Sequence, residues 1–508
     1  MPRATRRTTT RPSSVSIPNI PNGRRWWCAP YRRAAAAHVR EPPAGDPPGA
    51  GTGPGPDDMF VYDERSTELV FEYCRNRLML EPVPLDFGGG TTESLDEALR
   101  GLIGAAGRDP AEVLELFSSR LATAVISCDS PRFLSFIPAA PTKVSLLFDM
   151  VVSCSSLQGT TWLEAAGAVA AENQALAVLA DLVGLPPEAG GCFVSGGTAA
   201  NLSALVVARD TSPWARDGGG RPARIAVSTE SHSSVARALS VMGVLPLVVA
   251  VPDHRLTGSA LAEALAAEED TSDVVAVVAT AGTTNAGIVD DLSGVAEVAA
   301  AHRLWFHVDA AYGGAALFSP STRPRFSGIE RADSVVIDPH KWLFAPFDCA
   351  GLLYRRPALA KAVHTQKAAY LEVVHEVDDP AVWNPADYAV HLTRRARGLP
   401  LWFSLAVHGT DAYRHAVESV LAVAREAASM VQRALHLELV RQPELSIVLV
   451  RRPGWTPADY HHWSLQLLAD QTGFVTPTIW EGETVARFAF LHPHTTLAMV
   501  EQMLDSMV

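Results

Sequence analysis

The chain has 508 residues, of which 48% are hydrophobic and 19% charged, the balance of a globular protein with a large core. Its formal net charge of −13 excludes a nucleic-acid binder, because no excess of Lys and Arg is available to replace the counterions of phosphates. The six cysteines form no C-x-x-C pair, and no apolar run reaches the length of a membrane span. We therefore expect reduced thiols, no metal site, and a cytoplasmic protein that handles a small molecule.

Residues 1–57 differ in composition from the rest of the chain. Arginine recurs before the first acidic residue, Glu41, and a Pro/Gly-rich tract follows it. Such a segment buries too little apolar surface to offset its ordering entropy, so we expect a disordered extension. An Arg-rich, acid-free start is also typical of an organelle transit peptide, and a loose N-terminal extension is the alternative.

The remaining chain divides into three parts. Residues 58–142 begin with a helical pattern at 64–80 and look unable to form a compact core alone. In residues 143–402, short β-rich runs alternate with Ala-rich helical ones between 190 and 355, which predicts an α/β domain with a mainly parallel sheet covered on both faces. Residues 403–508 hold a long helix at 411–435 and strand patterns at 446–450 and 486–492, typical of a small α+β domain.

Small and polar residues follow the first strands of the predicted sheet, where ligands of α/β proteins gather. Gly197 and Thr198 follow the run 191–195 and open a helix, and a helix N-terminus suits a phosphate group. His232 follows the run 224–228, where an imidazole could stack on an aromatic ligand. A plain strand–helix turn and a helix cap are the alternatives for these two positions.

The later strands end in residues with stronger chemical implications. Thr284 lies in a small-residue loop after 274–280 that would allow a ligand to approach closely. Asp309 ends a hydrophobic strand, where a carboxylate is costly unless it is paired, as by a protonated pyridine nitrogen. Lys341 follows the run 334–337, and burial there would lower the pKa of its ammonium and free a nucleophilic amine. The alternatives are an aspartate that caps the next turn and a lysine that extends to the surface.

Together these residues supply a phosphate cradle, a ring-stacking histidine, a partner for a pyridine nitrogen and an imine-forming lysine. Pyridoxal 5′-phosphate requires these four functions. The stretches "SGGTAANLSAL", "SHSSVARA", "TAGTTNAG", "HVDAAYGG" and "DPHKWLFAPFDC" carry a more specific signal. With them, the chain from about Glu64 to its C-terminus resembles the group II pyridoxal-dependent decarboxylases, a family that includes the aromatic-L-amino-acid, histidine and glutamate decarboxylases.

This resemblance implies the fold of the fold type I pyridoxal-dependent transferases and a set of residue roles. By the resemblance, Lys341 holds the cofactor as an imine and Asp309 pairs the ring nitrogen. Ala311 packs beneath the ring, and His232 stacks on the ring and assists proton transfer. The resemblance also places Gly197, Thr198 and His340 near the phosphate and Thr284 near the ring substituents, and it makes Arg397 a structural arginine. It also implies a homodimer in which residues 58–142 wrap around the partner.

The resemblance further implies a mobile loop after the lysine, which reaches the neighbouring subunit's site and carries a tyrosine that protonates Cα after CO₂ leaves. Tyr370 has that place in "QKAAYLEVV". A tyrosine there favours release of an amine, because relatives that make aldehydes tend to have phenylalanine. An ordinary loop tyrosine is the alternative.

Two departures from the family pattern bear on the site. Asp338 stands where many relatives have asparagine, and we expect it to point away from the phosphate or to pair with a cation. The expected substrate wall is apolar: Phe136, Ile137, Pro138, Trp162 and Leu163. With no arginine evident to bind a second carboxylate, we expect an aromatic or branched aliphatic amino-acid substrate.

Two other functions remain open at this point. An aldehyde synthase or aminotransferase would use the same cofactor on the same fold. A nucleotide-dependent dehydrogenase would use the "SGGTAAN" turn and bind ribose through Glu230, but it leaves Asp309 and Lys341 without a role.

Overall fold

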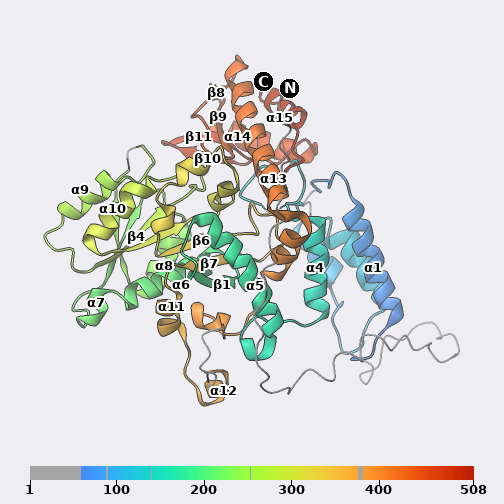
Figure 1. Ribbon diagram of the computed structural model, residues 1–508. Coiled ribbons are helices and arrows are strands. Elements are labelled where there is room, and N and C mark those ends of the chain that lie inside the picture. Colours follow the sequence, from blue (N-terminus) through green and yellow to red (C-terminus); the bar gives the residue numbers. More distant parts are fainter. Residues whose placement is uncertain (1–58, 87–89, 139, 252, 376–381) are drawn as a thin grey trace, which may run out of the picture.

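The computed structural model describes residues 59–86, 90–138, 140–251, 253–375 and 382–508. The disorder or transit peptide expected for residues 1–57 lies outside them. The described chain contains a seven-stranded sheet, a four-stranded sheet and an N-terminal helical segment (Figure 1).

The seven-stranded sheet has the order β1-β7-β6-β5-β4-β2-β3. Neighbours from β6 to β3 pair in parallel, and β7 pairs antiparallel with both β1 and β6. Every residue of β4, β5 and β6 is buried, because helices cover both faces. The expected mainly parallel α/β sheet is thus confirmed. Its strands are β1 (Gly190–Val194), β2 (Arg224–Ser228), β3 (Leu245–Val249), β4 (Val274–Thr280), β5 (Trp305–Asp309), β6 (Ser334–Ile337) and β7 (Ala350–Tyr354).

Helices on the two faces belong to two separate core clusters. One cluster takes side chains from α5 (Trp162–Val183), α9 (Gly258–Ala266) and α10 (Leu292–His302), and the other from α6 (Gly197–Asp210), α8 (Ser233–Met242) and α11 (Pro357–His364). By length and composition alone, α5 could cross a membrane, contrary to the expectation that no segment reaches that length. In this fold α5 packs in the core through residues such as Leu176 and Leu179.

The four-stranded sheet has the order β10-β11-β9-β8 and is antiparallel throughout. It consists of β8 (Glu438–Leu439), β9 (Ile447–Arg451), β10 (Pro477–Trp480) and β11 (Glu483–Ala489), and it packs with α13 (Leu399–Arg433), α14 (Pro457–Ala469) and α15 (Leu497–Asp505). The boundary expected at residue 402 falls inside α13, which begins twelve residues before the predicted 411. Side chains of both sheets join in one continuous core.

The N-terminal segment has helices but no core of its own. No residue is buried in α1 (Glu64–Met79), α2 (Thr92–Leu99) or α3 (Pro110–Leu116), and apolar side chains such as Phe71 and Ile103 are exposed. A further helix, α4 (Lys143–Cys154), packs against α13. Short elements complete the chain: α7 (Pro213–Arg216), α12 (Glu372–His375), a π-helical turn (Phe117–Leu121), and 3₁₀ turns at Gly313–Phe318, Arg323–Phe326, Ile329–Arg331, Ala369–Leu371 and Pro385–Tyr388.

Candidate active site

A cavity of about 260 Å³ opens at the carboxyl ends of the parallel strands. It gathers nine residues that the sequence singled out, although they lie at the ends of five separate strands. The lining comprises Gly196, Gly197, Thr198, Asn201, His232, Ser234, Thr280, Gly282, Thr284, Asp309, Ala311, Tyr312, Asp338, His340 and Lys341.

Lys341 enters this cavity from the turn after β6. Its Nζ lies 3.0 Å from Oδ2 of Asp338, and 23% of its side chain is exposed. Burial acts to lower the pKa of Lys341, but the negative charges of Asp338 and Asp309 outweigh it and raise the pKa above its usual value. The expectation of a lowered pKa is therefore wrong, because it took account of burial without these two neighbouring carboxylates.

The side chain of Asp338, a residue of the turn after β6, faces the cavity and contacts the first residue of α6. Its Oδ2 accepts a hydrogen bond of 3.1 Å from the amide of Gly197, while Oδ1 has no hydrogen-bond partner among the described residues. Of the two expected arrangements, pairing with a cation is found and pointing away is not. A Cβ atom on Gly197 would come within 3.0 Å of Asp338 Oδ2, so glycine allows this close approach.

Asp309 ends β5 and is buried at 6% exposure. Its Oδ2 accepts from the Asn201 side-chain amide at 2.9 Å, and its Oδ1 accepts from the Ala311 main-chain amide at 3.1 Å. Each carboxylate oxygen keeps a further lone pair for a donor in the cavity. A protonated ring nitrogen fits that requirement.

Asn201 is a site residue to which the sequence reasoning assigned no role. Because its Nδ2 donates to Asp309 and to Ser234, its Oδ1 must accept, and it lies 2.9 Å from Nε2 of His307. His307 therefore carries its proton on Nε2 and accepts at Nδ1 from Ser334 Oγ, 2.8 Å away. Burial lowers the pKa of His307 to about 4, in agreement with a neutral ring.

The same asparagine orients His232 through Ser234. Ser234 Oγ accepts from Asn201 at 3.0 Å and lies 2.9 Å from Nδ1 of His232, so its own hydroxyl proton is directed to the imidazole. The Ser234 amide also donates to Nδ1, at 3.2 Å. In the neutral ring the proton is thus held on Nε2.

His340 is fixed by the segment that leads into β7. Its Nδ1 accepts from the amide of Cys349 at 2.9 Å, and its Nε2 lies 3.7 Å from Asp338 Oδ2. Burial lowers the pKa of His340, although Asp338 acts to raise it. A neutral His340 therefore offers an Nε2–H group on the side of the cavity where Gly197 begins α6.

Arg487 is a second residue that the sequence reasoning missed. It lies on β11, within the strand predicted at 486–492, yet its guanidinium donates to the carbonyl of Thr284 at the cavity and to that of Phe136 at 3.0 Å. Burial lowers its pKa to about 10, and no carboxylate lies within ion-pair distance in the described part of the chain. Only a contact between the two sheets could have revealed it.

Other predicted residues lie outside this cavity. Tyr370, in the turn Ala369–Leu371, is 70% exposed. Phe136 and Leu163 are each 63% exposed. Trp162 begins α5 with its amide bonded to Asn384, and Arg397 pairs with Asp348 at 2.7 Å.

The remaining two wall residues, Ile137 and Pro138, also do not line the cavity. Ile137 packs against the large core cluster. One chain therefore does not assemble the expected apolar substrate wall around Lys341. Glu230, the ribose ligand of the dehydrogenase alternative, pairs instead with His254 at 2.8 Å.

The lining residues fit pyridoxal 5′-phosphate. Asp309 can accept from a ring N–H, and Lys341 presents a primary amine. The first turn of α6 and the neutral His340 offer N–H donors to a phosphate. Among the residues that the structure describes, the hydroxyl of Thr280 and Oδ1 of Asp338 have no hydrogen-bond partner, so this polar lining has capacity for a ligand.

Comparison with known proteins agrees with this fit. A family model described as "Pyridoxal-dependent decarboxylase conserved domain" matches residues 104–452. The aromatic-L-amino-acid decarboxylase of Bacillus atrophaeus is 29% identical over 469 residues, which is 89% of this chain and 94% of that protein. The L-2,4-diaminobutyrate decarboxylase of Rhizobium meliloti (strain 1021) is 32% identical over 71% of this chain and 74% of its own. The crystal structure of Oryza sativa TDC with PLP and tryptamine has a TM-score of 0.78 at 25% identity, covering 89% of this chain and 98% of that one.

Proposed function

This chain belongs to the family of pyridoxal-dependent decarboxylases and is a pyridoxal 5′-phosphate-dependent amino-acid carboxy-lyase, and from this premise we propose its substrate and the roles of its residues. We propose that it converts a hydrophobic L-amino acid, aromatic or branched aliphatic, to the corresponding amine and CO₂ in the cytoplasm. The observation that carries the proposal is the single cavity in which Lys341 and Asp309 meet.

When bound, pyridoxal 5′-phosphate supplies an aldehyde that captures amines and a protonated ring that takes up the electron pair left by CO₂. Lys341 holds the cofactor covalently through its amine. The first turn of α6, with Gly197 and Thr198, and His340 bind the phosphate. Thr284 and Ala311 line the same cavity and would contact the ring of the cofactor.

Asp309 keeps a proton on the ring nitrogen, because its carboxylate is anchored by two donors and faces the cavity. Asn201 holds that carboxylate in place and, through Ser234, also sets the orientation of His232. His232 would contact the ring and present its Nε2–H for proton transfer. One asparagine thus positions both residues that would interact with the ring.

Arg487 binds the α-carboxylate of the substrate. This role is supported by a buried guanidinium that has main-chain carbonyls for partners and no acidic residue among the described ion pairs. A planar fork suits a carboxylate, and an anion in the site would compensate the buried charge. By fixing the carboxylate, Arg487 would set the Cα–carboxylate bond across the plane of the ring, the orientation in which that bond breaks most easily.

The side chain of the substrate is proposed to be apolar. Among the cavity residues Lys341 is the only Lys or Arg, so a second carboxylate on the substrate would lack a cation after Arg487 is used. An aromatic-L-amino-acid decarboxylase and a tryptophan decarboxylase are among the relatives, at 29% and 31% identity. A diaminobutyrate decarboxylase is also among them, and this makes the substrate a matter for direct assay.

We propose that the enzyme is a homodimer whose second subunit completes the substrate wall. Three features support this: α1 to α3 bury no residue, Phe136 and Leu163 expose large apolar side chains, and Tyr370 lies on the surface of its own chain. In the dimer Tyr370 would protonate Cα at the site of the partner subunit, which would make the product an amine.

The central assignment is tested by reducing the purified enzyme with borohydride and mapping the modified residue. We expect the yellow imine absorbance to disappear and the label to be found on Lys341. Lys341→Ala should lose turnover by about 10⁴-fold or more, as expected when a covalent group is removed. Lys361→Ala, on the exposed face of α11, is the matched control and should keep full activity. A label on another lysine contradicts the proposal.

The partner's role is tested by subunit complementation. We expect that neither the Lys341→Ala enzyme nor the Tyr370→Phe enzyme forms the amine. The two variants are unfolded, mixed and refolded so that hybrid dimers form. If Tyr370 acts across the interface, one site in each hybrid has both residues and activity returns. If Tyr370 acts within its own chain, no hybrid site is complete and activity stays lost.

The alternative functions are separated by the products. An aldehyde synthase would release an aldehyde together with ammonia. An aminotransferase would transfer the amino group to an acceptor. We expect one amine and one CO₂ per substrate, without ammonia or peroxide. Substantial ammonia and aldehyde from the wild-type enzyme would refute simple decarboxylation.

A further inference from the structure

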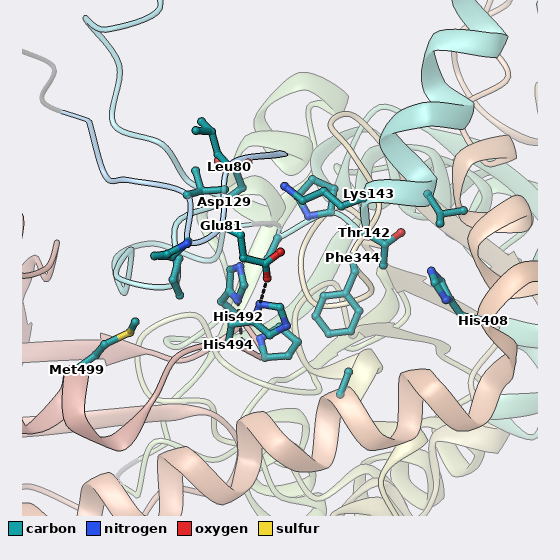
Figure 2. Close-up of a pocket in the computed structure, with 18 residues that line it drawn as sticks. Leu80, Glu81, Asp129, Thr142, Lys143, Phe344, His408, His492, His494 and Met499 are labelled. Carbon is teal, nitrogen blue, oxygen red and sulfur yellow. Dashed lines mark hydrogen bonds and ion pairs between the residues drawn. The ribbon is translucent and has the colours of Figure 1, made fainter. Parts of the chain in front are cut away.

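A second and larger cavity, of about 580 Å³, shares no lining residue with the cavity at Lys341. Figure 2 shows the side chains around it. Its walls come from the segment after α1, the loop before α4, the start of α4, α13 and the loop before α15. The lining residues are Leu80, Glu81, Pro82, Val83, Asp129, Pro131, Ala140, Pro141, Thr142, Lys143, Val144, Phe344, His408, Ala416, His492, Pro493, His494 and Met499. This volume lies in the range of small-molecule sites, which are mostly apolar with a few polar groups.

Most charges at this cavity are already paired. Glu81 lies 3.4 Å from His494, and Asp129 forms an ion pair of 2.8 Å with Arg77. Burial, together with the positive charge of Lys143 and the neighbouring His494, lowers the pKa of His492 to about 4, so this imidazole is neutral at pH 7.

Lys143 differs from these groups. Among the described residues no carboxylate lies within ion-pair distance of its ammonium. It is also the first residue of α4, a twelve-residue helix whose first turn adds partial positive charge on the same side. The cavity therefore combines apolar walls with an ammonium that is not paired with a carboxylate among the described residues.

We propose that this cavity binds a small apolar carboxylic acid, with its carboxylate at Lys143 and its hydrocarbon part against Phe344, Ala416 and Met499. Figure 2 shows Lys143, Phe344 and Met499 among the labelled side chains around the cavity. Charge complementarity selects the acid: an amine would meet Lys143 with like charge, and an uncharged molecule would leave that charge uncompensated.

The cavity also has a direct connection to the loop that carries Lys341. Phe344 is three residues beyond Lys341, and its ring lines the cavity. Its carbonyl accepts from the Thr142 amide at 3.0 Å and from Ser145 Oγ at 3.2 Å, which ties the start of α4 to this loop. A ligand that holds Lys143 and Phe344 together would fix the loop and so change turnover at Lys341.

The proposal is tested by titrating 3-phenylpropanoate into the holoenzyme by calorimetry. This acid lacks an amino group and cannot join the cofactor. We expect binding that weakens about tenfold in Lys143→Met and is unchanged in Lys361→Met, an exposed control. Ala416→Met, which narrows the cavity, should weaken binding similarly, and 3-phenylpropanol should bind equally in the wild type and in Lys143→Met. Retained cofactor absorbance shows that each variant is folded.

A second arm separates this cavity from the site at Lys341. We expect 3-phenylpropanoate to lower kcat at saturating amino-acid substrate, where competition at the Lys341 cavity is suppressed, and Lys143→Met to abolish this effect on kcat. Binding that survives in Lys143→Met but is lost in Arg487→Gln would place the acid in the Lys341 cavity and overturn the proposal. Absence of any binding to the holoenzyme would overturn it as well.

Discussion

The ammonium of Lys341 lies 3.0 Å from the carboxylate of Asp338, which also accepts the amide of Gly197 at the start of α6. One carboxylate therefore contacts both the amine proposed to hold the cofactor and the helix end proposed to bind its phosphate. Both contacts are electrostatically opposed to cofactor uptake, because they hold a proton on Lys341 and place negative charge beside the phosphate site.

Asp338→Asn should therefore accelerate the recombination of apoenzyme with pyridoxal 5′-phosphate. Asp338 raises the pKa of Lys341, so its removal lowers that pKa and increases the neutral amine at any pH below it. The rate of imine formation, followed by absorbance, should rise at pH 7, and its pH profile should shift to lower pH. Asp505→Asn, on the exposed face of α15, is the control. An unshifted profile would show that Asp338 does not set the charge of Lys341.

Asn201→Ala should weaken the site without removing any group that touches the reacting atoms. It takes one donor from Asp309 and leaves the Nε2–H of His307 without its acceptor. Each unsatisfied buried group costs about 1–3 kcal/mol, which should appear as a lower urea midpoint of the apoenzyme. Cofactor affinity should fall as well, measured by equilibrium dialysis. Unchanged stability and affinity would contradict the network.

Arg487→Gln should impair substrate use while the cofactor stays bound. Loss of a buried charge partner typically costs about 2–5 kcal/mol, so kcat/KM should fall by about 30-fold to 5,000-fold. The imine absorbance should remain, since Arg487 contacts main-chain carbonyls and not the Lys341 turn. Arg451→Gln, on the neighbouring β9 and paired with Glu483 at the surface, should have wild-type kinetics. A variant that loses its cofactor instead would assign Arg487 a structural role.

Glu172 should give the stability of the protein a distinct pH dependence. Its carboxyl is fully buried on α5 and accepts from the Gly398 amide at 2.7 Å, and burial raises its pKa from 4.5 to about 7. The folded state thus keeps a proton that the unfolded chain loses above pH 4.5. The contribution of this proton to the free energy of unfolding is therefore complete below pH 4.5 and is lost as pH rises to about 7. The free energy of unfolding falls by about 3 kcal/mol over this range. In Glu172→Gln the unfolding midpoint should lack this decline, and a wild-type decline that persists in the variant would contradict the assignment.

The sequence predicted the parallel sheet and its strand-end residues because both depend on local patterns. Continuous apolar runs mark buried strands, and the carboxyl ends of parallel strands meet at one edge, so Gly197, His232, Asp309 and Lys341 converge without knowledge of the tertiary contacts. The start of α13 at Leu399 was not predicted, since Pro400 and the kink at Gly409 interrupt the helical pattern.

Site residues that depend on distant contacts were not predictable in this way. Arg487 bonds to Thr284, 203 residues earlier, and in sequence it is an ordinary polar position of a strand. Asn201 follows a recognised turn, but its importance comes from His307 and Asp309, more than 100 residues away. The raised pKa of Lys341 likewise required the position of the Asp338 side chain. For Tyr370, Phe136 and Trp162, the proposed roles require a second chain.

The place of Arg487 on β11 has a consequence for biosynthesis. Every residue that lines the Lys341 cavity precedes position 342, whereas the guanidinium proposed for the substrate belongs to the last strand of the four-stranded sheet. During translation, the groups that attach the cofactor are therefore made long before the group that orients the amino acid. A polypeptide terminated ahead of Glu483 would possess the complete set of cofactor ligands and would lack the means to position a carboxylate for cleavage. If Arg487 binds the substrate as proposed, competence for catalysis is acquired only in the final steps of synthesis, when β11 pairs with β9.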